Sequence, residues 1–258
     1  MKFERQHFYP TVDSLKAVED GAKRILPEEQ ALSEWHEVYS SNHKSRIALD
    51  LDLTKQEITP NSTVLEFGSV PLLFTAALSS SNYKVIGCDI APERYGKAIN
   101  DLGINVIKCN IESEKLPFPD NSFDAVVFNE LFEHLRIDLI FTLSEVLRVM
   151  KPGGLMMLSS PNLRSLVGVS NFLFRNRAYS CSGNVYQEYL KLQKLGHMGH
   201  VREYTTTEVI EFLESVGFVV KKLVYRGRYN TNFRQAMIRL FPALSPFVSY
   251  IAEKPTRG

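Results

Sequence analysis

From residue 62 onward, hydrophobic positions follow two alternating patterns. Short apolar runs typical of buried strands alternate with apolar residues at helical spacing, which predicts βαβ units around a largely parallel sheet. The runs expected to form strands are residues 64–67, 84–89, 104–109, 123–128, 155–158, 218–225 and 248–252. One helical stripe comprises Leu139, Ile140, Leu143, Val146, Leu147 and Met150. The predicted fold is α/β, with a Rossmann-like, doubly wound, mixed sheet of seven strands.

Local signals set helix ends and divide the chain. Pro71 suits the first turn of a helix that runs to residue 78, because proline lacks the N–H that would be unpaired there. Thr205 and Glu208 have the spacing of a capping box, and Gly217 suits the end of that helix. Residues 1–60 are expected to be a helical segment that packs on a main domain, residues 61–258. Within that domain, residues 161–203 are a long insertion, expected to cap the substrate site.

Composition narrows the class of protein. The chain has 258 residues, 44% hydrophobic and 23% charged, which is an ordinary globular profile. It lacks a run of about 20 apolar residues, and its first residues lack the apolar stretch of a secretory signal. Three cysteines without C-x-x-C spacing argue against a disulfide framework and a zinc site. We expect a cytoplasmic protein with no transmembrane segment, either a monomer or a homodimer.

The first predicted strand leads into a loop that could bind an anion. It reads Glu66-Phe67-Gly68-Ser69-Val70-Pro71, and N–H groups at the start of the next helix suit a carboxylate or phosphate. Asp89 ends the second strand, where an acid can accept hydrogen bonds from both hydroxyls of a ribose. A nicotinamide enzyme would share these features, but the fingerprint G-x-G-x-x-G is absent because Val70 stands at its second glycine. A dehydrogenase is therefore disfavoured.

Four motifs then follow in order. They are Leu116-Pro117-Phe118-Pro119-Asp120-Asn121-Ser122-Phe123-Asp124, Asn129-Glu130-Leu131-Phe132-Glu133-His134-Leu135, Arg148-Val149-Met150-Lys151-Pro152-Gly153-Gly154 and Gly199-His200-Val201-Arg202-Glu203-Tyr204. With the loop and Asp89, this order resembles the class I S-adenosylmethionine-dependent methyltransferases, particularly the small-molecule, type 11-like group. The resemblance covers roughly residues 60–225. It implies a methyltransferase that uses S-adenosyl-L-methionine.

The resemblance also implies which residues bind the cofactor. They are Glu66, Gly68, Ser69, Asp89, Ile90, Asn110, Ile111 and Asn129. The loop would cradle the methionine end, Asp89 would bind the ribose, and Ile90 would pack on the adenine face. Asn110 and Ile111 would lie at the adenine edge, and Asn129 on the sulfonium side. The family commonly has Asp at the position of Asn110, whose amide can still accept a hydrogen bond from the adenine amino group.

The glycine loop departs from the family pattern E-x-G-x-G-x-G. Gly68 is kept, but Val70 and Leu72 replace the other two glycines. A β-branched valine tolerates positive φ badly, and Pro71 favours extended geometry for the residue before it. The loop therefore either holds the cofactor in a modified way or has lost binding. Since Asp89, Asn110 and the end of strand four are kept, we favour modified binding.

His134 and His200 are the candidate catalytic residues. Methyl transfer mainly requires alignment of the acceptor, and a base is needed only if the acceptor's proton must leave early. The resemblance places His134 at the methyl-transfer centre, and an imidazole suits proton transfer near neutral pH. Each histidine could instead be structural. His197 and Met198 suggest a mobile lid, and we expect no metal ion because the histidines of that segment lack further ligands.

The acceptor is less clearly indicated. Residues 162–202 hold six basic side chains against one acidic, and residues 219–258 hold eight against one. In the first block, Phe172 and Phe174 lie beside Arg175 and Arg177, a mixture that suits an anionic group on a larger body. The alternative is a cap that packs its aromatic side chains on the core. We expect a small biosynthetic acceptor, with an anionic sugar, nucleotide-linked or lipid-linked compound favoured.

Two other functions stay open. Val70 and Leu72 would also fit a catalytically silent, methyltransferase-like binding protein. An RNA methyltransferase is the other alternative. DNA is not expected as a partner, because the chain lacks the polar-Pro-Pro-aromatic run of amino-methylating enzymes and the Pro-Cys nucleophile of cytosine-carbon enzymes.

Overall fold

The computed structural model describes residues 2–4, 8–195 and 199–256, so His197 and Met198 of the predicted lid lie outside the described residues. The strands form one sheet in the order β1-β7-β8-β6-β5-β2-β3-β4. Their bounds are β1 Lys2–Glu4, β2 Thr63–Phe67, β3 Lys84–Asp89, β4 Asn105–Lys108, β5 Phe123–Asn129, β6 Met150–Pro161, β7 Val219–Arg226 and β8 Phe247–Glu253. Strands β2 to β8 correspond to the seven predicted strands, and the Rossmann-like α/β fold is confirmed.

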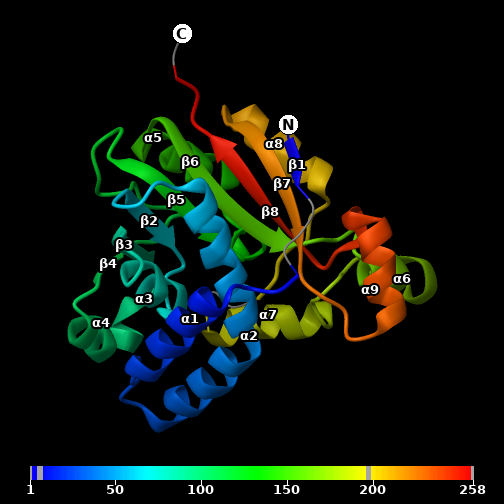
Figure 1. Ribbon diagram of the computed structural model, residues 1–258, viewed down its shortest axis with the longest axis horizontal. Helices are drawn as coiled ribbons and strands as arrows, with labels where there is room; N and C mark the ends of the chain where they lie inside the picture. The colour runs from blue at the N-terminus through cyan, green and yellow to red at the C-terminus, as the bar shows by residue number, and fades with distance from the viewer. Residues whose placement is uncertain (1, 5–7, 196–198, 257–258) are drawn as a thin grey trace. The chain divides into compact units, whose positions relative to one another are not determined.

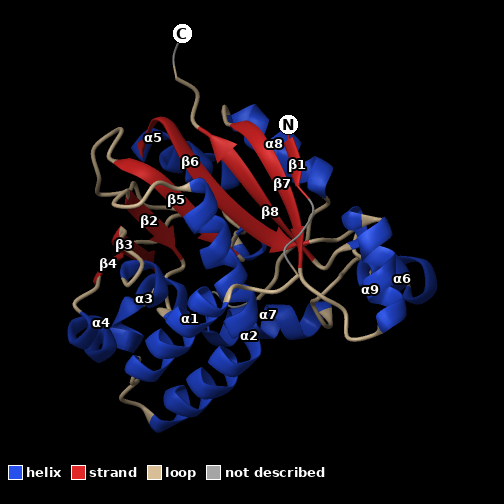
Figure 2. Cartoon of the chain, in the orientation of Figure 1, coloured by secondary structure: helices blue, strands red, loops and turns tan. Residues whose placement is uncertain are grey.

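Strand β1 is the element that the sequence pattern missed. It pairs in parallel with β7, with Lys2 opposite Lys222, and β7 pairs antiparallel with β8, which makes the sheet mixed (Figure 2). Most of residues 1–60 is helical, in α1 and α2, and this short strand is an addition to the expected helical segment. Three residues are too few to show the two-residue period of a strand.

The chain divides into two compact units. The N-terminal unit is Tyr9–Val127 with Arg148–Leu155, and the C-terminal unit is Met1–Phe8, Phe128–Leu147 and Met156–Gly258. Neither coincides with a division at residue 60, and the predicted domain boundary and cap stay predictions.

In the N-terminal unit, parallel strands carry the loops of interest at their carboxyl ends. Strand β2 pairs with β3 from Thr63 opposite Lys84 to Phe67 opposite Cys88, and β3 pairs with β4. Helices α1 (Val12–Arg24), α2 (Gln30–Glu57) and α3 (Leu73–Ser79) pack together beside these strands (Figure 1). The Thr11 N–H and hydroxyl both donate to the Asp52 carboxylate, which ties the start of α1 to α2.

The starts of α3 and β6 differ from the positions predicted from the sequence. Helix α3 begins at Leu73 and not at Pro71, because Leu72 has a left-handed backbone with φ of 71°. Strand β6 begins at Met150, where α5 (Leu139–Val149) ends, so the Pro-Gly-Gly run lies inside the strand. The remaining helices are η1 Pro92–Tyr95, α4 Gly96–Leu102, η2 Phe132–His134, α6 Leu166–Arg175, α7 Val185–Leu195, α8 Thr206–Val216, α9 Asn232–Leu240 and η3 Pro242–Leu244.

In the C-terminal unit, the predicted capping box is confirmed. The Thr205 hydroxyl accepts from the Glu208 N–H, the Glu208 carboxylate accepts from the Thr205 N–H, and Gly217 ends α8 with φ of 115°. Helices α6 and α7 form within the insertion.

Candidate active site

The glycine loop is anchored to the neighbouring strand by its backbone. The N–H groups of Gly68 and Ser69 donate to the Cys88 carbonyl at 2.9 and 3.3 Å, and the Leu72 N–H donates to the Ser69 carbonyl at 2.6 Å. The Thr75 hydroxyl also donates to that carbonyl, at 3.2 Å. These bonds fold the chain tightly at the carboxyl end of β2.

The two replaced glycines behave differently. Positive φ occurs at Gly68 (66°) and Leu72 (71°) but not at Val70, as expected for a β-branched residue before proline. The Leu72 side chain is fully buried, so its packing offsets the strain of a left-handed backbone. The loop therefore keeps a sharp turn without the second and third glycines of the family pattern.

Asp89 closes this loop from β3. Its Oδ2 accepts from the Val70 N–H at 3.0 Å, and its Oδ1 accepts from the Ala91 N–H at 2.9 Å. A carboxylate oxygen has room for a second hydrogen bond, so Asp89 can hold the loop and still accept from ribose hydroxyls. The side chain predicted to bind ribose thus also shapes the loop.

Buried polar atoms in the loop fit a polar ligand. Glu66 Oε2 and Ser69 Oγ are buried and, within the described part of the chain, have no hydrogen-bond partner. Burial raises the pKa of Glu66 to about 8, the Thr75 hydroxyl opposes this shift, and the Asp89 carboxylate adds to it. Because buried polar groups are normally satisfied, two such atoms in one loop suit the ammonium and carboxylate of a methionine moiety.

The other predicted cofactor residues are less closely grouped. Ile90 follows Asp89 and is 37% exposed, which leaves apolar surface for an aromatic ring. Asn110 and Ile111 follow β4; Asn110 Oδ1 accepts from the Glu112 N–H at 3.2 Å, so this oxygen already closes a turn. Asn129 ends β5 in the C-terminal unit, and its Nδ2 is buried with no hydrogen-bond partner among the described residues.

Packing beneath the loop gives one test. A Cβ on Gly87 would lie 2.8 Å from Ser69 Oγ and 2.9 Å from Ser69 Cβ. Gly87→Ala is therefore expected to displace the loop and weaken cofactor binding by about tenfold or more, because overpacking commonly costs about 1–3 kcal/mol. Gly96→Ala is the control, since its Cβ would meet no atom within 4 Å. Calorimetric titration should separate the two variants; equal affinities would contradict the close approach.

The raised pKa of Glu66 gives a second test. Folded Glu66 holds its proton from the model-peptide value of 4.5 up to about 8, so the wild type loses stability relative to Glu66→Gln as pH rises through this window. The variant's advantage in free energy of unfolding should grow by up to about 4 kcal/mol between roughly pH 5 and pH 8, at about 1.4 kcal/mol per unit. Urea unfolding at several pH values measures it. A constant difference would contradict the raised pKa.

Two histidines meet in the C-terminal unit. His134 ends η2 after β5, and its ring lies 4.6 Å from the ring of His200, at an interplanar angle of 86°. His134 Nδ1 lies 3.1 Å from the Gly199 carbonyl, and His200 Nδ1 lies 3.0 Å from Ser182 Oγ. The structure thus brings together both candidate catalytic residues from segments 66 positions apart in the sequence.

A buried carboxylate organises the chain around His200. Glu203 accepts from the N–H groups of Ser180, Cys181 and Ser182 at 2.6, 3.2 and 2.9 Å, and from the hydroxyls of both serines. Burial alone would raise the pKa of Glu203, but hydrogen bonds from His200, Ser180 and Ser182 outweigh it and hold the pKa well below its usual range. Glu203 therefore fixes the 180–182 segment against His200.

The environment of His134 changes its expected role. Burial, and then the neighbouring His200, lower the pKa of His134 to about 4. The imidazole is unprotonated at neutral pH, but a group with such a low pKa is a weak proton acceptor there. The His134 ring therefore suits a role in which its nitrogen lone pair contacts a ligand better than a role in which it removes a proton.

Two further parts belong to this cluster, and sequence reasoning missed the first of them. The buried Arg226, at the end of β7, donates to Glu130 Oε1 at 2.6 Å, and the Ser159 hydroxyl donates to the same atom. The second part is Glu133. One of its carboxylate oxygens, one ring nitrogen of His134 and one ring nitrogen of His200 all lie within 4.8 Å of one another. His200 therefore has further metal-ligand side chains beside it, contrary to the expectation from the sequence.

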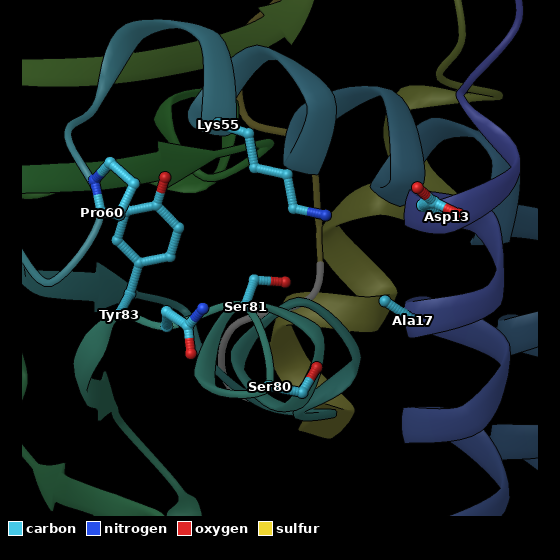
Figure 3. A pocket seen from close by; sticks show the side chains of 8 residues that line it. Asp13, Ala17, Lys55, Pro60, Ser80, Ser81 and Tyr83 are labelled. Carbon is cyan, nitrogen blue, oxygen red and sulfur yellow. The ribbon is translucent and has the colours of Figure 1, made fainter.

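A separate hollow of about 420 Å³ lies in the N-terminal unit. It is lined by Asp13, Ala17, Lys55, Pro60, Ser80, Ser81, Asn82 and Tyr83 (Figure 3). Lys55 reaches into it from α2 and donates to Ser14 Oγ at 3.2 Å. Because β3 starts just after Tyr83 and ends at Asp89, the hollow lies at the opposite end of that strand from the glycine loop.

Comparison with known proteins decides the class. Residues 65–158, which run from the glycine loop through most of β6, match a family model described as a methyltransferase domain. These residues form a class I, S-adenosylmethionine-dependent methyltransferase domain. The methyltransferase has no match among curated proteins. In the described part of the chain, no helix has the length and apolar character needed to cross a membrane.

Solved structures support the fold of this methyltransferase. A SAM-dependent methyltransferase from Aquifex aeolicus is 20% identical with a TM-score of 0.54, covering 80% of this chain and 88% of its own. One from Archaeoglobus fulgidus is 18% identical with a TM-score of 0.57, covering 85% and 100%. A Haloferax volcanii methyltransferase, solved with the activator Trm112, is 17% identical with a TM-score of 0.57, covering 84% and 93%. The cofactor of the methyltransferase is S-adenosyl-L-methionine.

Proposed function

We propose that the methyltransferase moves a methyl group from S-adenosylmethionine to a small, anionic biosynthetic acceptor in the cytoplasm. When bound, the cofactor supplies the methyl group on a sulfonium centre open to in-line displacement. Glu66, Gly68, Ser69 and Asp89 would hold it through the loop and the ribose. His134 and His200 would contact and orient the acceptor's attacking atom.

The single observation that supports this acceptor class is the surface of α6. Phe172 and Phe174 are 65% and 83% exposed, and they lie beside Arg175 at the end of the helix, with Arg177 just after it. Exposed aromatic faces next to fixed positive charge suit an anionic group on a larger body. This surface belongs to the same unit as the histidine pair.

Charge reversal tests the proposal. Arg175→Glu and Arg177→Glu should each raise KM for the acceptor found in a metabolite screen by about tenfold, or about 1.4 kcal/mol, and added salt should shrink the penalty. Arg24→Glu, on the exposed end of α1, makes the same change of net charge and should leave KM unchanged. Wild-type KM in both variants at low salt would rule out an anionic acceptor held by these arginines.

Turnover and RNA-binding measurements distinguish the two alternative functions, a silent binding protein and an RNA methyltransferase. A silent binding protein would give no turnover with any acceptor. An RNA methyltransferase would show RNA binding that weakens steeply with salt, because binding to the phosphate backbone releases counterions.

A further inference from the structure

Glu133, His134 and His200 form a set of three metal-ligand side chains in the C-terminal unit. Each offers one ligand atom, and the three atoms lie within 4.8 Å of one another. Glu133 is 1% exposed, so its carboxylate is held inside the protein. The geometry points to a site for one divalent transition-metal ion, held by Glu133, His134 and His200.

The hydrogen bonds of both imidazoles favour this arrangement. Imidazoles that bind metals usually donate their other ring N–H to a carbonyl or carboxylate, which fixes the tautomer. His134 Nδ1 faces the Gly199 carbonyl at 3.1 Å. His200 Nδ1 faces Ser182 Oγ at 3.0 Å and Glu203 Oε1 at 3.9 Å. With Nδ1 so engaged on both rings, Nε2 carries the lone pair that a metal ion would bind.

The backbone near His200 is fixed as well. The His200 N–H donates to Glu188 Oε2 at 3.1 Å, and Glu188 is buried. A Cβ on Gly199 would lie 2.3 Å from the Glu188 carbonyl, so α7 and the Gly199–His200 backbone approach closely. The ligand from this segment is therefore held in place before any ion binds.

A second possible ligand set shares His200 but fits less well. Cys181, His200 and Glu203 also have ligand atoms within 4.8 Å of one another. The Glu203 carboxylate, however, already accepts three backbone N–H bonds and two hydroxyl bonds. Glu203 therefore orients His200 from the Nδ1 side, and the ion is assigned to the Nε2 side of the ring.

The ligand types indicate which ion would bind and what it would do. Two imidazoles and one carboxylate suit Zn²⁺ or Fe²⁺ better than Mg²⁺, and three protein ligands leave a position open. An acceptor hydroxyl in that position would have a lowered pKa, and its proton would leave to solvent while its oxygen kept the electron pair. This role rests on the proposed function, whereas ion binding itself can be measured without turnover.

The test uses Zn²⁺ and Co²⁺ on full-length protein freed of metal with a chelator. Calorimetry with Zn²⁺ should give one site, and Co²⁺ should give visible absorption with the intensity of a low-symmetry nitrogen and oxygen site. Glu133→Gln and His200→Ala should weaken binding by more than about 100-fold, beyond the usual effect of losing an outer hydrogen-bond partner. Cys181→Ser and His43→Ala should bind like the wild type. Circular dichroism and S-adenosylmethionine affinity report whether each variant is folded.

Three results would overturn the site. They are no binding of either ion to the wild type, unchanged binding in a folded Glu133→Gln variant, or loss of binding in Cys181→Ser. If ions fail to bind while S-adenosylmethionine binds, only the metal site is rejected. If ions bind while S-adenosylmethionine does not, the proposed function is rejected and the metal site stands.

Discussion

The Asp89→Ala variant is expected to bind S-adenosylmethionine about 1.5–3 kcal/mol more weakly than the wild type, the range for losing hydrogen bonds to a charged group. Two losses combine in this variant. The ribose loses its acceptor, and the N–H groups of Val70 and Ala91 lose the carboxylate that holds them at 3.0 and 2.9 Å. Isothermal titration calorimetry measures the dissociation constants.

Two further variants make this experiment specific. Asp89→Asn keeps one acceptor oxygen and should retain part of the affinity. Asp101→Ala removes an exposed acid that pairs with Lys97 on α4, and it should bind like the wild type. An unchanged dissociation constant for Asp89→Ala would mean that Asp89 does not hold the cofactor.

The second large effect is expected for Glu203→Ala. Removing a buried carboxylate that accepts three backbone N–H bonds from residues 180–182 leaves those donors unpaired. Loss of a buried charged partner commonly costs about 3–5 kcal/mol, and we expect a loss of that size in the free energy of unfolding at neutral pH. Urea unfolding measures it, and hydrogen exchange should show faster exchange of the amides at 180–182.

The pH dependence of this effect has a definite sign. Because the pKa of Glu203 is held below its usual range, its contribution is present at neutral pH and is lost as pH falls below the usual glutamate value. The difference between wild type and Glu203→Ala should therefore shrink in acid. A small difference at neutral pH, with amides 180–182 still protected, would contradict the network around Glu203.

Much of the fold could be predicted from the sequence, because each main strand carries its own apolar run and turn signals. The capping box of α8 needs only local spacing, and Thr205 and Glu208 take that arrangement. Strand β1 could not be predicted, since three residues show no period and its pairing with β7 joins the two ends of the chain. The start of α3 was wrong because Leu72 takes a left-handed backbone that the sequence pattern does not indicate for leucine.

The candidate site was predictable only where the resemblance supplied positions. Asp89 was singled out, but its hold on the Val70 N–H depends on how the loop folds back over β3. The contact of His134 with His200 is long-range, and neither residue's neighbours in sequence predict it. Glu133 lies beside His134 in sequence, yet its place in a three-ligand set with His200 depends on tertiary structure.

The most direct test of cofactor binding is a calorimetric titration of the wild-type protein with S-adenosylmethionine. We expect saturable binding at one site per chain, because the loop keeps its turn through Gly68 and Leu72 and keeps its link to Asp89. Absence of binding heat at several temperatures, up to near-millimolar cofactor, would contradict it and would favour a silent, methyltransferase-like binding protein.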